Sequence, residues 1–390
     1  MRPLLRALLS SWLVVVCLAA LSRDARAETA IDLYTVGPGS YLYSAYGHSI
    51  LCARDASAKP AEGKGKCYDY GVADKPDELY AFWGSVRGRA IFVPISLDDR
   101  ALVAFFTDQG RAMERQVLPL SADEASALAA SLEHDVTSRF AYAYHPYTAN
   151  CASLLRDRID EATHGRLRPG LSQPGAATFR QRMEVGLSGR AFELAALSFI
   201  LGPMSERAPN GWEAMFTPEG LRDGVAERLG VKAEPLAERQ AYILPTSVTA
   251  GRLLIFLVAG ALFAGVRFGA RKNRLGVAIK VVGIVLGLLA LLVDATALLS
   301  TWPELSRNFC LVVLLPTDLA LGFMSPRWLV PYLKARLGMV VALAALEVVS
   351  VVGQPVLPQV VLVALPLAAI FFALRATAKA PSPKAEPSAA

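Results

Sequence analysis

The last third of the chain restricts its fold most, because it carries five apolar runs separated by short polar segments. The runs cover residues 251–266, 276–299, 308–323, 337–352 and 356–374. About 20 apolar residues cross a bilayer as a helix, and the shorter runs extend into their flanks. The sequence therefore predicts an all-α transmembrane bundle of about five helices over residues 246–376. The tail, 377–390, is rich in Ala, Pro, Ser and Lys and is predicted to be disordered.

Basic residues predict the orientation of this bundle. They gather in alternate connections and in the tail, at Arg267, Arg271, Lys272, Arg274, Arg327, Lys334, Arg336, Arg375, Lys379 and Lys384. The intervening loops, 300–307 and 353–355, carry one basic residue, Arg307. Cytoplasmic loops are rich in Lys and Arg, so the residues before the bundle should lie outside. The same clustering accounts for the formal charge of +6 without a nucleic-acid partner.

Residues 1–27 have the pattern of a signal peptide, with Arg2 and Arg6 before an apolar core at 8–21 and small residues at Ala25 and Ala27. An uncleaved N-terminal anchor is the alternative. Export to an oxidising compartment lets cysteines pair. Cys52 and Cys67 flank a polar hairpin loop, and a disulfide between them would contribute roughly 3 kcal/mol. Cys151 would then be free, although its pairing with either of them stays open.

Cys151 follows Asn150, a residue type that caps helices, and precedes apolar Leu154, Leu155 and Ile159 at helical spacing. A helix N-terminus stabilises negative charge, so a cysteine there can be a reactive thiolate. A half-buried structural cysteine is the alternative.

A cysteine nucleophile needs a base, and His48, before a short apolar strand, is the first candidate. Asp69 is the only carboxylate of the strand at 67–71 and can orient the imidazole, unless another polar group does so. His145 ranks second because it is close to Cys151 in sequence, and its aromatic neighbours suit either packing or an acyl-chain groove. His134 is expected in solvent at a helix end.

The pattern between these residues predicts a single α+β domain at 28–245. We expect strands at 91–95 and 115–120, a helix at 98–110 and a helix from a capping box at 121–124 to about 134. The apolar segment 191–204 is too short to span a bilayer and suits a core or interfacial helix. Within the spans, Asp294, Asp318 and Glu347 are expected toward the outer side, with packing or headgroup roles.

Several motifs together resemble a known family. They are Tyr46-Gly47-His48-Ser49, the strand Tyr68-Asp69-Tyr70-Gly71, the segment 115–121, Asn150-Cys151 followed by Arg156-Asp157, and the Phe216-Thr217-Pro218 signature ahead of membrane helices. In this order they resemble the Lnb N-terminal periplasmic domain and, more broadly, circularly permuted papain-like and lecithin:retinol acyltransferase-like thiol enzymes. The resemblance implies a permuted papain-like fold for the soluble domain and a location in the bacterial inner membrane, with the N-terminal domain in the periplasm.

The resemblance also implies a lipoprotein N-acyltransferase, with membrane phospholipid as acyl donor, a lipoprotein as acceptor, and no cofactor or metal. Catalytic roles then go to Cys151, His48 and Asp69. Supporting roles go to Asn150, Tyr46, Ser49, Tyr70, His145, Arg156 and Asp157. Two alternatives remain, a membrane-tethered cysteine peptidase or amidase that uses water, and a non-catalytic membrane scaffold.

Overall fold

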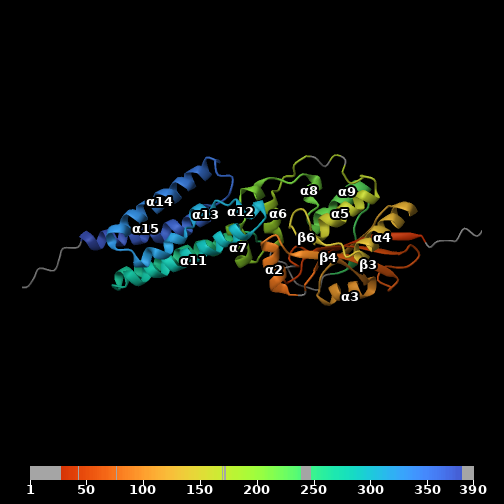
Figure 1. Ribbon diagram of the computed structural model, residues 1–390, viewed down its shortest axis with the longest axis horizontal. Helices are drawn as coiled ribbons and strands as arrows, with labels where there is room; N and C mark the ends of the chain where they lie inside the picture. The colour runs from red at the N-terminus through yellow and green to blue at the C-terminus, as the bar shows by residue number, and fades with distance from the viewer. Residues whose placement is uncertain are drawn as a thin grey trace, which may run out of the picture.

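The computed structural model describes residues 28–42, 44–75, 77–168, 170, 173–238 and 247–379. The predicted signal peptide, the predicted domain boundary at 245 and most of the predicted tail lie outside these residues. The described part consists of a domain built on an antiparallel sheet and an elongated group of helices at one end of it (Figure 1).

The sheet has seven strands in the order β6-β4-β3-β2-β1-β5-β7, and every neighbouring pair is antiparallel. Its strands are β1 (Thr29–Val36), β2 (His48–Asp55), β3 (Gly65–Ala73), β4 (Ile91–Asp98), β5 (Met113–Val117), β6 (Tyr142–Ala143) and β7 (Glu234–Ala237). Both central strands, β1 and β2, are buried over most of their length, as expected for strands covered on both faces.

Helices cover the two faces of the sheet unequally (Figure 1). Apolar residues of α4 (Ala122–Thr137), α5 (Cys151–Ala162) and α9 (Pro218–Leu229) form one core with the strands, whereas α3 (Asp99–Asp108) packs alone on the opposite face. The predicted capping box of α4 is present at Ser121 and Glu124. The remaining elements of this domain are α2 (Glu78–Val86), α6 (Phe179–Gly186), α7 (Ala191–Ile200), η1 (Pro203–Glu206) and α8 (Gly211–Ala214).

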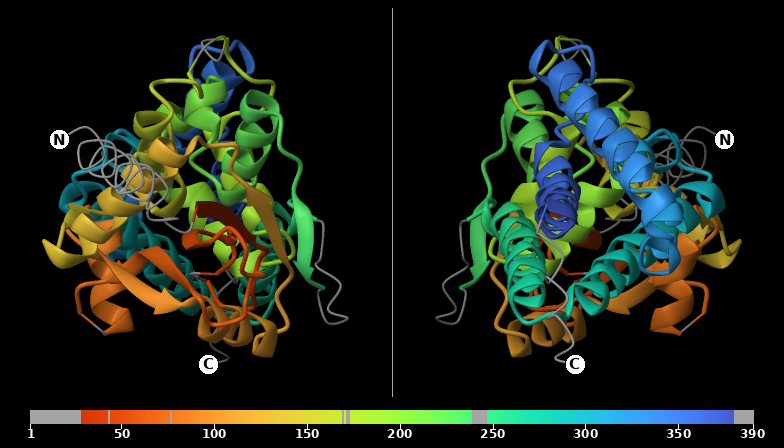
Figure 2. Two further views of the ribbon diagram at one scale, coloured as in Figure 1. Left: turned by 90° about the vertical axis from the view of Figure 1, so that its right-hand side faces the viewer. Right: turned by 90° about the vertical axis from the view of Figure 1, so that its left-hand side faces the viewer.

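Five segments are long and apolar enough to cross a membrane: α10 (Ala250–Arg271), α11 (Leu275–Leu299), Pro303–Phe323, α14 (Pro326–Val348) and α15 (Leu357–Lys379). Seen from the end of the bundle, the dark-blue α15 lies between α10 and α14 (Figure 2), and it packs against both. The helix α15 continues to Lys379 and so includes the first residues of the segment 377–390, which the sequence assigned to the tail.

The third predicted span is not one helix. It consists of α12 (Pro303–Ser306), α13 (Cys310–Val313) and the 3-10 helix η2 (Pro316–Phe323). Backbone groups freed by such breaks must find partners inside the protein. The Asn308 side chain accepts a hydrogen bond from the amide of Cys310, and the Arg336 guanidinium donates to the carbonyl of Val313 at 2.9 Å. The apolar run predicted a span, but its proline at 316 interrupts the helix.

Two predictions about charge in the bundle are wrong for a related reason. Arg336 is not a free cytoplasmic charge, because α14 begins at Pro326 and buries it against Asp318, with Nη2–Oδ2 and Nε–Oδ1 distances of 2.6 and 3.0 Å. Nor does Asp318 lie toward the outer side. Its carbonyl packs beside Gly283, near the start of α11 and away from the sheet domain. The partners of this buried guanidinium are a carboxylate and a carbonyl, which it reaches through Nε and Nη2.

The helix α7 joins the two regions. Its Ala195 and Phe199 belong to the apolar core of the bundle, and Gly251 at the start of α10 packs against Leu194 and Ala195. The side chain of Asn308 caps the end of α7 by donating to the carbonyls of Phe199 and Ile200. The sheet domain is therefore seated on the ends of the spans, which places any site at this junction close to the membrane surface.

Candidate active site

Cys151 is the first residue of α5, as its sequence context predicted. Asn150 adopts an extended backbone, and its side-chain oxygen accepts hydrogen bonds from the amides of Ala152 and Ser153, each at 2.9 Å. The amide of Cys151 is the first N–H group of α5, where the helix itself supplies no backbone acceptor. Cys151 is partly exposed and forms no disulfide with another described cysteine.

His48 begins β2 and is positioned by the strand ladder. It pairs with Val36 of β1. Gly47, directly before it, has a φ of 78°, and a side chain there would collide with the Val36 carbonyl, so glycine suits this position. Cys52 and Cys67 form a disulfide across β2 and β3 in the same register. Continuing this register toward the start of β2 sets His48 opposite Gly71, where a methyl group would overlap the imidazole at Cε1. The ring therefore occupies space that a glycine leaves empty.

Asp69 holds the imidazole in place. Its Oδ1 lies 2.8 Å from His48 Nε2 and also accepts a hydrogen bond from the Gly71 amide at 2.6 Å. Both side chains are nearly buried, with 15% and 12% of their surfaces exposed. With Nε2 engaged by the carboxylate, Nδ1 is the ring nitrogen left for a second partner.

That second partner is Cys151. Burial disfavours its thiolate, but the charge of His48, their hydrogen bond and the Ser49 amide outweigh burial and lower the pKa of Cys151 below its ordinary 9.0. Burial likewise disfavours the imidazolium, but Asp69 and Cys151 raise the pKa of His48 well above 6.5. The two shifts favour a thiolate beside an imidazolium over the neutral thiol and imidazole. This is the electrostatic state of an activated thiol nucleophile.

Asn150 also explains the Phe216-Thr217-Pro218 signature. Its side-chain amide donates to the carbonyls of Pro146 and Phe216, at 2.7 and 3.0 Å. Pro218 then begins α9 and lies beside Gly47. One short segment thus contacts both the residue before His48 and the residue before Cys151, so the signature residues fix the relative position of the two.

Other predicted supporting residues act through the fold. Ser49 is fully buried and contributes its amide to the thiol, as noted above. The Tyr70 hydroxyl donates to Asp135, which binds β3 to α4. Arg156 pairs with Asp157, donates to the Trp212 carbonyl at 3.0 Å and lies over the Trp212 ring.

The competing histidines lie elsewhere. His134 is exposed in the last turn of α4. His145 accepts a hydrogen bond from the Tyr147 amide at Nδ1, and its Nε2 lies 3.5 Å from Oε2 of Glu304 in α12. Both ring nitrogens of His145 are therefore engaged. Tyr46 is half-buried, and its ring fills the space beside Gly186.

Two tyrosines and a tryptophan complete the surroundings of Cys151. Burial raises the pKa of Tyr142 and Tyr144, and the nearby charge of Cys151 adds to the effect on both hydroxyls. The Tyr144 ring lies 6.4 Å from that of Trp302, which follows α11. The sequence indicated an aromatic cluster at 142–147, but its contact with Trp302 joins residues too far apart in the chain to be read from spacing.

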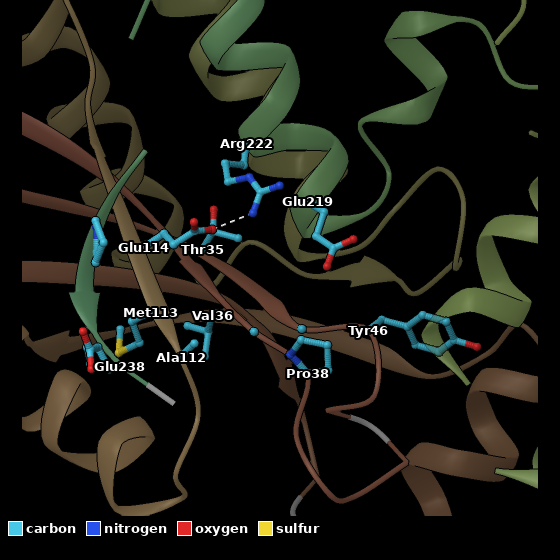
Figure 3. A pocket seen from close by; sticks show the side chains of 14 residues that line it. Thr35, Val36, Pro38, Tyr46, Ala112, Met113, Glu114, Glu219, Arg222 and Glu238 are labelled. Atoms are coloured by element: carbon cyan, nitrogen blue, oxygen red, sulfur yellow. Dashed lines mark hydrogen bonds and ion pairs between the residues drawn. The ribbon is translucent and has the colours of Figure 1, made fainter. Parts of the chain in front are cut away.

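A cavity of about 270 Å³ lies behind the start of β2 (Figure 3). Tyr46 and Gly47 line it, with residues of β1, β5 and α9, and Arg222 and Glu114 pair at its wall. His48, Asp69 and Cys151 do not line it. The chemistry therefore lies at the junction with α5 and not in this cavity. No group of three or more His, Cys, Asp or Glu side chains in the described residues is arranged to hold a metal ion.

Comparison with known proteins gives one finding. No curated protein and no solved structure matches the chain. Residues 20–183 match the family model described as the Lnb N-terminal periplasmic domain. The matched segment contains His48, Asp69 and Cys151 and ends before the Phe216-Thr217-Pro218 signature and the membrane spans. Over this segment the chain is similar to the Lnb N-terminal periplasmic domain. Five candidate membrane spans follow the segment within the described residues.

Proposed function

We propose that this protein is a membrane-bound thiol acyltransferase of the Lnb type. In the first step the Cys151 thiolate attacks the acyl ester carbonyl of a phospholipid. The amide of Cys151 is placed to stabilise the oxyanion, and His48 as imidazolium gives its proton to the departing alkoxide. The carbon–oxygen bond breaks, a thioester forms on Cys151, and a lysophospholipid leaves.

In the second step the free amine at the N-terminus of a lipoprotein attacks this thioester. Neutral His48 accepts a proton from the amine as the new amide bond forms, and the Cys151 sulfur leaves as the thiolate. The imidazolium and the thiolate are thereby restored. Asp69 keeps Nε2 engaged in both steps, so that Nδ1 faces the reaction.

The observation that carries this proposal is the row of three interacting groups near the junction with the spans. They are the thiol of Cys151, the imidazole of His48 and the carboxylate of Asp69. Trp302 lies two residues after Ser300, the C-cap of α11, and its ring is close to that of Tyr144. The charge of Cys151 helps to raise the pKa of the Tyr144 hydroxyl. A thiol at this level suits substrates that do not leave the bilayer. The order of histidine strand first and cysteine helix second also supports the permuted papain-like relation, which is part of the proposal.

The test uses the full chain in liposomes that contain phospholipid with a radiolabelled acyl chain. We expect label on Cys151, released by hydroxylamine as thioesters are, and its passage to the amine of an added diacylated lipopeptide. Cys151→Ala should carry no label while keeping the thermal unfolding profile of the wild type. A chain that takes no label in any lipid contradicts acyl transfer.

The same experiment distinguishes the hydrolytic alternative. A peptidase or amidase would leave the lipid untouched and cleave a peptide in a Cys151-dependent way, with water as acceptor. Equal biological function of wild type, Cys151→Ala and His48→Ala would instead support the scaffold.

A further inference from the structure

The helix α2 presents two aromatic side chains to its surroundings. Phe82 and Trp83 are 38% and 43% exposed, and their rings contact each other at 5.6 Å. Arg87 and Arg89 follow directly, and Arg89 is exposed. Exposed adjoining aromatic residues on a folded domain mark an interaction surface. Tryptophan beside arginine is the combination found at the level of lipid headgroups.

This aromatic pair is tied to the outer end of a membrane span. The Thr301 amide and hydroxyl donate to the carbonyl of Arg87, each at 3.3 Å. Gly88, with φ of 65°, packs directly against Thr301 and Trp302. Leu298, in the last turn of α11, is 84% exposed. Figure 1 shows α2 at the end of the sheet domain that adjoins the bundle. The exposed Leu298 of α11 therefore lies three residues from Thr301, which binds Arg87 just after α2.

The same helix also packs beside the segment that leads to Cys151. Gly84 on α2 packs against Ala90, because a methyl group at 84 would lie 3.1 Å from the Ala90 side chain. The carbonyl of Ala90 accepts a hydrogen bond from the Tyr144 amide at 2.9 Å. Tyr144 adjoins Cys151, as described above. Ala90 and Tyr144 thus link α2 to the segment that leads to Cys151.

We infer that α2 inserts into the outer leaflet of the membrane and forms the lip over which a phospholipid reaches Cys151. Phe82 and Trp83 lie among the upper acyl carbons, and Arg89 meets the headgroup phosphate. The occupant of this surface is phospholipid because Leu298, which is exposed in the last turn of α11, lies three residues before Thr301, and Thr301 binds Arg87 just after α2. The insertion of α2 is independent of the proposed function. The role of α2 as a substrate lip rests on the proposed function.

Fluorescence quenching tests the insertion. The full chain is placed in nanodiscs of phosphatidylcholine, either plain or brominated at the upper acyl carbons, and emission is compared between wild type and Trp83→Phe. We expect the component lost in Trp83→Phe to be strongly quenched by the brominated lipid. The matched control is Trp212→Phe, because Trp212 lies between Arg156 and Arg168 and its emission should not respond to bromine. A Trp83 component that ignores bromine and responds to aqueous iodide overturns the inference.

The role as a lip is tested by the acyl donor. In the Phe82→Ser, Trp83→Ser double variant, labelling of Cys151 from bilayer phospholipid should fall by about tenfold or more, since two apolar side chains no longer enter the lipid. Labelling from a water-soluble short-chain ester should not change. Phe105→Ser is the control, because Phe105 is 58% exposed on α3, on the opposite face of the sheet. Equal loss with both donors, or equal loss in the control, contradicts the lip. If wild type takes no label at all, the proposed function fails while the quenching result still decides the insertion.

Discussion

At the scale of single residues, the decisive contact is the charge pair of His48 and Cys151. The pKa of Cys151 lies below 9.0 and that of His48 well above 6.5, and each charge sustains the other. The thiolate–imidazolium pair is therefore populated between the two shifted pKa values. It is lost on the acid side as Cys151 takes up a proton and on the alkaline side as His48 loses one.

This pair predicts the pH dependence of thiol reactivity. Alkylation of Cys151 by iodoacetamide should already be fast at neutral pH in the wild type. In His48→Ala the burial of the thiol is no longer offset, so the midpoint should move up toward or beyond 9.0. The rate of alkylation, followed by mass spectrometry between pH 5 and pH 10 (roughly the range that brackets both groups), measures both midpoints. A wild-type midpoint at or above that of His48→Ala would contradict the charge pair.

Gly71 gives a second prediction at this scale. Gly71→Ala should push the imidazole out of its place, because the new methyl group overlaps Cε1 of His48. Acyl transfer should fall by about 10²-fold or more, as expected when a general base is displaced. The control is Gly37→Ala, whose new methyl group would meet Ala112 at an ordinary 3.5 Å. Turnover of the two variants with the same lipid donor is the measurement, and equal activity would show that His48 has room to move.

The sequence was sufficient to predict these residues individually, but not their contacts. The helix cap at Asn150 and the strand beginning at His48 follow local rules, and both are confirmed. The space over Gly71 follows only from the β2–β3 register, which adjacent sequence does not determine. The pairing of His145 with Glu304 joins residues 145 and 304, so no local pattern could indicate it.

At the scale of elements, Asn150 connects α5 to the segment before α9. Its side chain accepts hydrogen bonds from the amides of Ala152 and Ser153 and from the Ser153 hydroxyl, and it donates to the carbonyls of Pro146 and Phe216. An ordinary helix cap needs only the first two. The others explain why asparagine, which both donates and accepts, occupies this position.

Asn150→Ala should therefore destabilise the domain by more than the loss of a cap alone, about 2–4 kcal/mol for a cap and two unsatisfied buried carbonyls. Thermal and denaturant unfolding of the full chain measure the change. Asn150→Asp serves as the matched comparison, because aspartate keeps the cap but cannot donate to the two carbonyls. It should recover part of the loss. Equal stability of wild type and Asn150→Ala would mean that the hydrogen bonds of the Asn150 side chain contribute nothing.

The elements of the bundle show where apolar composition stops being informative. Five runs predict five spans, and five candidate spans are present. Composition does not indicate the break in the third, which depends on Asn308 and Arg336 supplying partners for backbone groups. The sequence predicts Arg336 as a loop residue, but in the structure it lies within α14 and pairs with Asp318.

At the scale of the whole molecule, the spans alternate in direction and place their basic ends away from the sheet domain. Lys272 lies in the turn between α10 and α11, at the basic end, and Lys64 is exposed in the hairpin loop of the sheet domain. The positive-inside rule assigns the first to the cytoplasm and the second to the outside.

Matched cysteine variants test this topology. Lys64→Cys and Lys272→Cys, each in a chain with Cys151 and Cys310 changed to Ser, are treated in whole cells with a membrane-impermeant maleimide that passes only the outer envelope. We expect Lys64→Cys to be labelled at once and Lys272→Cys only after the membrane is opened. The reverse order of labelling would mean the opposite membrane topology, in which Cys151 lies in the cytoplasm and cannot reach exported substrates.

The position of α7 affects how the protein can be handled. Ala195 and Phe199 belong to a core made otherwise of residues beyond 250, so a fragment that ends before residue 250 would present that side of the helix to water. Such a fragment should aggregate or associate with detergent micelles, even though its sheet is complete. Biochemists who want a free-standing enzyme from this chain would need to replace those side chains with polar ones.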